Sequence, residues 1–195
     1  WGGKAKVSKA LKYNVNETLP AILYRSSSVK DNHNSMVLKF KGGWSLEFRV
    51  FNDGVAYRFA SEASKGYEIA SEQAEINFPA DQKVFTPYVK GSEGKSFDRQ
   101  FQNSFENIYT ETTVCGMNPQ QLSFLPILVD AGAGMKICIS QVNLEAYPGM
   151  YLCNQDGSAS LKGVFAPYPK KQVAGGYNDI QLIVPERESY IAKVD

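Results

Sequence analysis

The sequence predicts an all-β fold, a sandwich or barrel of antiparallel strands. Short segments rich in aromatic and β-branched residues alternate with turn residues roughly every 8–15 positions. No segment keeps a helical period for more than about two turns. Tyr and Phe each occur eleven times in 195 residues, which favours strands. The turn spacing is typical of sandwiches and barrels, and we expect one domain over residues 1–195.

The clearest element is a β-hairpin over residues 43–61. Its turn signal contains Asp53 and Gly54, residue types that accept turn conformations more easily than most. A two-residue turn at this pair gives a register that gathers five apolar side chains on one face, whereas a slip by one residue mixes charges among them. These side chains are Phe48, Val50, Val55, Tyr57 and Phe59.

The same register places Arg49 opposite Arg58 on the other face of the hairpin. Like charges directly opposite each other are destabilising. We therefore expect the rest of the protein to supply a carboxylate or another acceptor. We interpret both arginines as structural ion-pair partners, and contact with a ligand is the alternative.

The remaining segments are assigned in chain order from their alternation and turn residues. Residues 1–20 and 26–35 are polar and predict irregular structure, and residues 90–102 and 170–177 predict surface loops. Strands are expected at residues 21–24, 36–40, 67–70, 74–78, 84–89, 107–115, 122–130, 135–144, 147–152, 161–168, 179–184 and 189–194.

The charge balance excludes several classes of partner. With 21 basic and 20 acidic residues the net charge is +1, which does not indicate nucleic acid or an anionic membrane surface. No apolar run approaches the roughly 20 residues that span a bilayer.

The chain begins at Trp1 with no signal peptide or initiator Met, so we expect a processed piece of something longer, with any targeting segment upstream.

Cysteine and histidine usage predicts no catalytic residues in this chain. The cysteines Cys115, Cys138 and Cys153 form no Cys-x-x-Cys pair. Cys138 reads as a buried apolar residue, and a Cys138–Cys153 bridge stays open as an alternative. The single histidine, His33, falls in the polar loop expected at residues 30–35, which argues against a zinc site or a Ser-His-Asp triad.

Two stretches, however, carry a family resemblance. Residues 48–59, FRVFNDGVAYRF, resemble the F-R-x-(Y/F)-x-D-G-(V/I)-A-F-R-Y hairpin of the N-terminal domain of glycoside hydrolase family 97. Residues 139–150, ISQVNLEAYPGM, look like that domain's I-x-E-A-D-L-x-D-Y-P-G-M segment. The resemblance covers most of the chain. It implies an antiparallel β-super-sandwich, similar to galactose mutarotase, with an incomplete first sheet at its N-terminal side.

The resemblance also implies a function. Such domains pack on a downstream catalytic (β/α)8 barrel in periplasmic or secreted α-glucosidases and α-galactosidases of Gram-negative bacteria. The barrel supplies the catalytic residues and most ligands of a calcium ion, and the N-terminal domain adds one glutamate. Gln141 stands at that position, and its neutral amide can still ligate calcium, although more weakly. Glu145 is the alternative ligand.

Two other functions are alternatives for this sequence. A free-standing carbohydrate-binding module is supported by the aromatic content: Trp44, Tyr88, Tyr109, Tyr147, Tyr151 and Tyr168. A mutarotase-type enzyme is disfavoured because its acid–base chemistry commonly uses histidine and the only histidine falls in a polar loop. We also expect self-association through strand edges that the incomplete sheet leaves exposed.

Overall fold

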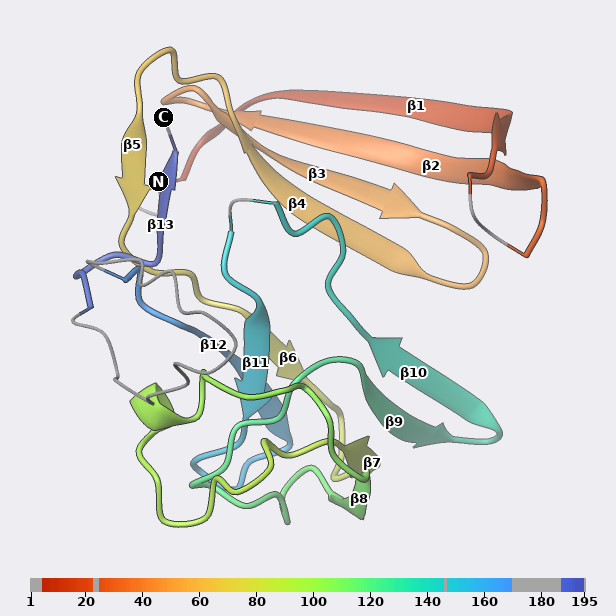
Figure 1. Ribbon diagram of the computed structural model, residues 1–195. Helices are drawn as coiled ribbons and strands as arrows, with labels where there is room; N and C mark the ends of the chain where they lie inside the picture. The colour runs from red at the N-terminus through yellow and green to blue at the C-terminus, as the bar shows by residue number, and fades with distance from the viewer. Residues whose placement is uncertain (1–4, 23–24, 146, 170–186, 195) are drawn as a thin grey trace. The chain divides into compact units, whose positions relative to one another are not determined.

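The computed structural model is built almost wholly from antiparallel strands (Figure 1), and it describes residues 5–22, 25–145, 147–169 and 187–194. The all-β, antiparallel class is confirmed, and within these ranges the one helical element is a short 3-10 turn. The chain divides into two units, residues 1–65 and 66–195, and each is described by itself. Whether residues 1–195 act as one domain stays a prediction. No described helix is long and apolar enough to cross a membrane.

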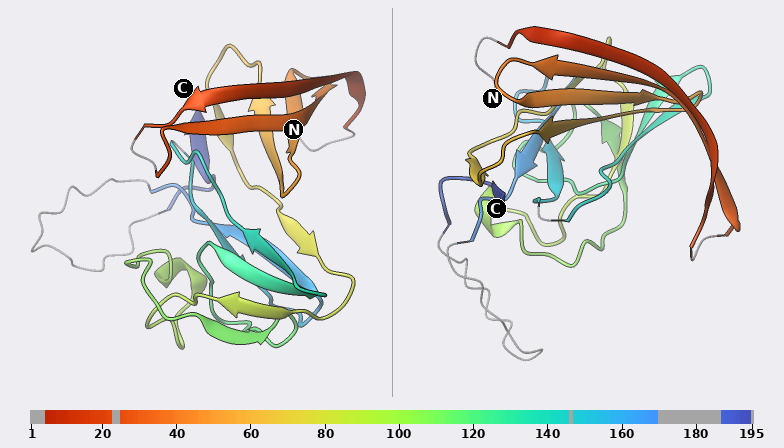
Figure 2. Two further views of the ribbon diagram at one scale, coloured as in Figure 1. Left: turned by 90° about the vertical axis from the view of Figure 1, so that its right-hand side faces the viewer. Right: turned by 90° about the horizontal axis from the view of Figure 1, so that it is seen from above.

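The first unit is one four-stranded meander. Its strands lie in chain order, β1 (Val7–Pro20), β2 (Ser28–Phe40), β3 (Trp44–Val50) and β4 (Val55–Ser61), and each pairs with the next. Figure 2 shows that β1 and β2 are long and strongly bent.

The expectation of irregular structure was wrong for residues 7–20 and 28–35. Residues 7–20 form β1, and residues 28–35 belong to β2, which extends the strand expected at residues 36–40. The two strands pair almost continuously, although most of their side chains are exposed. Backbone pairing therefore holds polar strands that a search for buried alternation misses. The expected strand at residues 21–24 is not formed at residues 21 and 22, and residues 23–24 lie outside the described residues.

The hairpin forms where the sequence predicts it, but its turn is Asn52–Asp53. The Phe51 N–H donates to the Gly54 carbonyl at 2.8 Å, and Phe48 faces Tyr57 instead of Phe59. The register thus differs from the expected one by two residues. An even shift keeps every side chain on its face, so the predicted apolar face is preserved.

The shift changes the charge pairing on the other face. Arg58 lies opposite Glu47, and its Nε donates to Glu47 Oε2 at 2.7 Å. Arg49 lies opposite Ala56, so the expected Arg49–Arg58 juxtaposition was wrong. The interpretation of Arg58 as an ion-pair partner is confirmed.

The described residues of the second unit form three small sheets (Figure 1). One has the order β10-β9-β7-β8, one has β11-β12-β6, and the third pairs β13 with β5. The strands are β5 (Tyr67–Ile69), β6 (Glu75–Asn77), β7 (Lys83–Thr86), β8 (Thr110–Thr113), β9 (Ile127–Gly132), β10 (Met135–Ile139), β11 (Met150–Cys153), β12 (Ser160–Phe165) and β13 (Ala192–Val194).

A single aliphatic cluster joins the first two of these sheets. Val84 on β7, Ile127 on β9, Leu152 on β11 and Leu161 on β12 have no accessible surface. The strands predicted in the described part of this unit are confirmed, each shorter than expected, although β7, β9, β11 and β12 extend one or two residues past the expected bounds at one end. Residues 90–102 form the expected loop, with η1 (Phe97–Arg99) inside it. The loop expected at residues 170–177 and the strand at 179–184 lie outside the described residues.

The cysteines and the histidine are placed differently from expectation. All three cysteines are free, so the Cys138–Cys153 bridge is not formed. Cys138 is exposed rather than buried, because β10 is an edge strand. His33 is buried within β2 instead of lying in a loop, and its Nδ1 lies 2.6 Å from Asp31 Oδ1.

Candidate functional site

The segment that carries the second family motif folds into a closed loop. β10 ends at Ile139, five residues earlier than predicted, and β11 begins at Met150. Asn143 has a φ of 55°, in the left-handed region that Asn enters more readily than most residues. This residue lies past the end of β10, in the stretch that was expected to stay extended as far as residue 144.

Gln141 closes that loop. Its Oε1 accepts the Met150 N–H at 2.7 Å, so a side chain just after β10 fixes the first residue of β11. Gln141 is half-buried. The carbonyl oxygen keeps a second lone pair, and the amide NH2 keeps its donors. The loop thus presents a neutral carbonyl oxygen in a fixed place.

Tyr147 anchors the same loop to a distant part of the unit. Its hydroxyl donates to Glu72 Oε2 at 2.6 Å, and its ring makes an edge contact with Phe165 at 6.0 Å between centroids. Burial of the ring raises the pKa of Tyr147 well above its usual range, and the Glu72 carboxylate raises it further. The phenol therefore stays neutral and donates across the physiological range.

The two predicted calcium ligands differ in their surroundings. Gln141 is committed to the Met150 bond, whereas Glu145 is exposed. In the described part of the chain, no three His, Cys, Asp or Glu side chains could together hold a metal ion. Gln141 thus supplies a neutral carbonyl oxygen and Glu145 an exposed carboxylate.

Glu72 is a site residue that sequence reasoning missed. It precedes β6 and lies 75 residues before Tyr147 in the chain. No motif or spacing links the two positions. Only the fold, which brings the segment between β5 and β6 against the loop, reveals the contact.

Most of the aromatic side chains considered as sugar contacts have structural roles. Tyr88 and Tyr151 are buried, and Trp44 stacks on Phe40 with 4.0 Å between ring centroids. Tyr168 packs on Tyr190 at 5.4 Å. Tyr109 is 44% exposed, and its hydroxyl donates to the Pro126 carbonyl at 2.9 Å.

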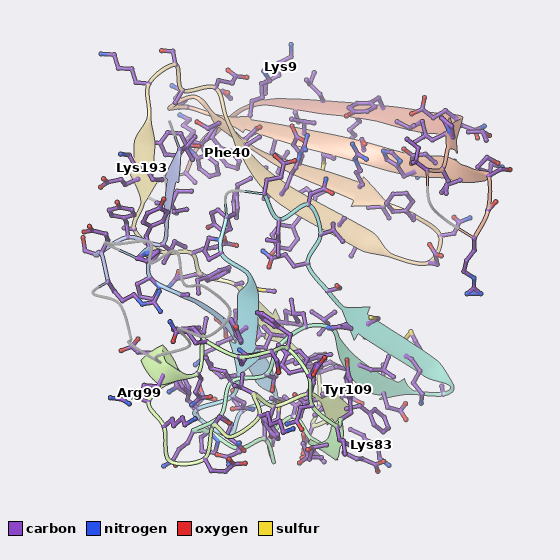
Figure 3. The ribbon with its side chains drawn as sticks, in the orientation of Figure 1. Lys9, Phe40, Lys83, Arg99, Tyr109 and Lys193 are labelled. Carbon is purple, nitrogen blue, oxygen red and sulfur yellow. The ribbon has the colours of Figure 1, made fainter. Side chains whose placement is uncertain are left out.

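The second unit also has a polar depression of about 700 Å³ beside β8. Figure 3 marks this end of the unit by Lys83 on β7 and Tyr109 just before β8. The lining side chains are mostly hydroxyls, amides and carboxylates: Tyr88, Glu93, Asn107, Thr110, Glu111, Thr112, Met117, Asn118, Pro119 and Gln121, with Gly116 among them.

The strands and their antiparallel pairing define an all-β domain of the sandwich class, and sequence comparison gives the family. The profile described as "Glycosyl-hydrolase 97 N-terminal" matches residues 1–190. The chain therefore belongs to the family of glycoside hydrolase 97 N-terminal domains. The resemblance inferred from residues 48–59 and 139–150 is confirmed.

A similar curated protein is the "Retaining alpha-galactosidase" of Bacteroides thetaiotaomicron, which is 44% identical over 195 residues. The match covers 100% of this chain and 30% of that protein, so the chain spans about a third of its relative's length.

Solved structures share the fold. A glycoside hydrolase family 97 enzyme from Pseudoalteromonas sp. strain K8, in complex with acarbose, matches with a TM-score of 0.66 at 20% identity. The match covers 84% of this chain and 24% of that enzyme. A variant of the Pseudoalteromonas enzyme with panose gives the same values. The predicted β-sandwich class is thereby confirmed.

Proposed function

We propose that this chain is the non-catalytic N-terminal domain of an α-galactosidase and that it supports a downstream (β/α)8 catalytic barrel. The observation that carries the proposal is 44% identity to a retaining alpha-galactosidase along the full 195 residues. We infer that the substrate is an oligosaccharide with an α-linked galactose, and an α-linked glucose is the alternative. The family also favours a periplasmic or secreted location.

The absence of catalysis from this chain rests on the surroundings of its acids and its histidine. His33 is buried beside Asp31. Of the acids near the closed loop, Glu72 is bonded to Tyr147 and Glu145 is exposed. Glycoside hydrolysis needs a pair of carboxyl groups held on either side of the scissile bond. In this proposal the barrel supplies that pair.

The role of the closed loop is to present Gln141 to a calcium ion held mainly by the barrel. Calcium takes six to eight oxygen ligands and accepts amide carbonyls, so the free lone pair of Gln141 Oε1 fits one position. The bond from Met150 would hold that oxygen in place. When bound, calcium would act as a Lewis acid on a substrate oxygen. A neutral ligand gives weaker binding than the family's glutamate.

Hydrolysis assays test the proposal. The native polypeptide that carries this chain and the 195-residue chain alone would each be given aryl α-galactosides and aryl α-glucosides. We expect hydrolysis of the galactoside by the native polypeptide and none by the chain alone. Turnover by the chain alone would overturn the non-catalytic role. Failure of the native polypeptide on both substrates would overturn the assignment to an α-glycosidase.

A further inference from the structure

We propose that the polar depression beside β8 is a second saccharide site, distinct from the closed loop and specific for neutral, hydroxyl-rich ligands. In Figure 1 and in the left view of Figure 2, β8 lies at the bottom of the second unit and the segment between β10 and β11 at its top. The site goes beyond the proposed function, because it needs neither the barrel nor calcium.

The depression has a floor that the fold holds in place. Tyr88 Oη accepts the Asn118 N–H at 2.9 Å, and burial raises the pKa of this phenol, so it stays neutral. Gln121 is 7% exposed and donates to Ser92 Oγ at 2.7 Å. Met117 is 3% exposed. These groups form a rigid, partly apolar base, as small-ligand sites usually have.

The side of the depression formed by β8 is also fixed. Asn107 Nδ2 donates to the Tyr88 carbonyl at 2.8 Å, and Thr112 Oγ1 donates to the Gly116 carbonyl at 3.2 Å. A β-carbon on Gly116 would lie 3.1 Å from Thr112 Oγ1 and 3.0 Å from the hydroxyl of Thr113. A side chain at residue 116 would therefore require these two threonine hydroxyls to shift slightly.

Polar groups remain available on the rim. Thr110 is exposed on the rim of the depression. The Glu93 carboxylate contacts Gln121 Nε2 only at 3.5 Å. In addition, β8 is an edge strand, so one of its edges carries no strand within the described residues. The rim thus offers an exposed threonine and an exposed glutamate to a ligand.

The charge of the lining selects the class of ligand. Glu93 and Glu111 are acidic, and the residues that line the depression include no Lys, Arg or His. Anionic ligands such as phosphates and uronates are therefore disfavoured by repulsion. A neutral sugar satisfies carboxylate, amide and hydroxyl groups at once, because each sugar hydroxyl both donates and accepts.

A calcium ion fits this lining less well. Glu111 Oε1 is already bonded to Lys83 Nζ at 2.6 Å, which neutralises one of the two carboxylates. No set of three acidic, His or Cys side chains in the described ranges could hold a metal. The volume of about 700 Å³ also suits a small organic ligand rather than a single ion.

Hydrogen–deuterium exchange of the native polypeptide tests the inference, because it localises binding apart from any catalytic site. Raffinose, maltotriose and a digalacturonate would be added separately at millimolar concentration, with calcium chloride alone as a fourth sample. We expect slower exchange in peptides covering residues 107–121 with a neutral sugar, and no change there with digalacturonate.

The affinity of substituted proteins for the sugar provides a quantitative test. Glu93→Gln keeps the size of the side chain and removes its charge, which should weaken sugar binding roughly tenfold, while Thr110→Val should weaken it about threefold. Glu68→Gln on β5 is the matched control, because this exposed residue lies outside the depression.

Three results would overturn the assignment. These are no protection of residues 107–121 by either neutral sugar, equal affinity in the Glu93→Gln and Glu68→Gln variants, or the same protection by calcium chloride alone. Loss of hydrolysis in the earlier assay would leave this result unaffected, so failures of the two proposals are distinguishable.

Discussion

Replacement of Gln141 separates the structural role of the closed loop from its proposed metal role. Gln141→Ala removes the acceptor of the Met150 N–H, a 2.7 Å bond between half-buried groups. A typical net hydrogen bond contributes about 1 kcal/mol, and we expect a loss of this size in the free energy of unfolding. For a chain of 195 residues this corresponds to a fall in Tm of about 2–4 °C.

Gln141→Glu is the matched variant. A carboxylate keeps an oxygen that accepts the Met150 N–H, and a charged acceptor bonds more strongly than a neutral one. We therefore expect this variant to unfold within about 0.5 kcal/mol of the parent or to be more stable. Urea unfolding followed by circular dichroism measures both variants. Equal midpoints for the parent and Gln141→Ala would refute the loop-closing role.

Three further outcomes follow from contacts in the second unit. Tyr147→Phe should cost about 1 kcal/mol, because it removes the 2.6 Å bond to Glu72. The raised pKa of Tyr147 contributes stability that is fully present below the unfolded value of about 10 and is lost as pH rises through the folded value. The stability of the Tyr147→Phe variant should therefore begin to fall at a similar pH to that of the parent, but it should fall less steeply as the pH rises. A dependence of stability on pH identical to the parent's would contradict this expectation. Gly163→Ala places a β-carbon 2.8 Å from that of Ala74 and should cost about 1–3 kcal/mol, whereas Gly54→Ala meets no atom within 4 Å and should be nearly neutral in the same urea assay.

The hairpin shows that the alternation of apolar and polar residues predicts the apolar face of a strand pair but not the position of its turn. Alternation correctly identified the face that carries Phe48 and Tyr57, because any even shift of register keeps that face. The choice between turns at 52–53 and 53–54 depends on local backbone geometry, and the three residues Asn52, Asp53 and Gly54 suit both. The turn was therefore misplaced by one residue, which moved Arg58 from Arg49 to Glu47.

The sequence predicted only part of the candidate site, because contacts within the folded chain determine the rest. The motif at residues 139–150 led to Gln141, but not to the bond that closes the loop. The apolar run instead predicts a strand that continues through Asn143, where the chain has a φ of 55°. The Glu72 contact with Tyr147 depends on tertiary structure over 75 residues, where local patterns carry no information.

The geometry of the closed loop is compatible with either an amide or a carboxylate at residue 141. The Met150 N–H needs one oxygen acceptor, and an amide and a carboxylate both supply it. The loop can therefore keep its shape when the charge at residue 141 is lost. The affinity for a hard cation, by contrast, depends on that charge. In the native polypeptide, Gln141→Glu should thus raise the stabilisation that calcium gives while changing the calcium-free Tm by no more than about 2 °C. Stabilisation by calcium that is the same in both proteins would place residue 141 outside the metal's ligands.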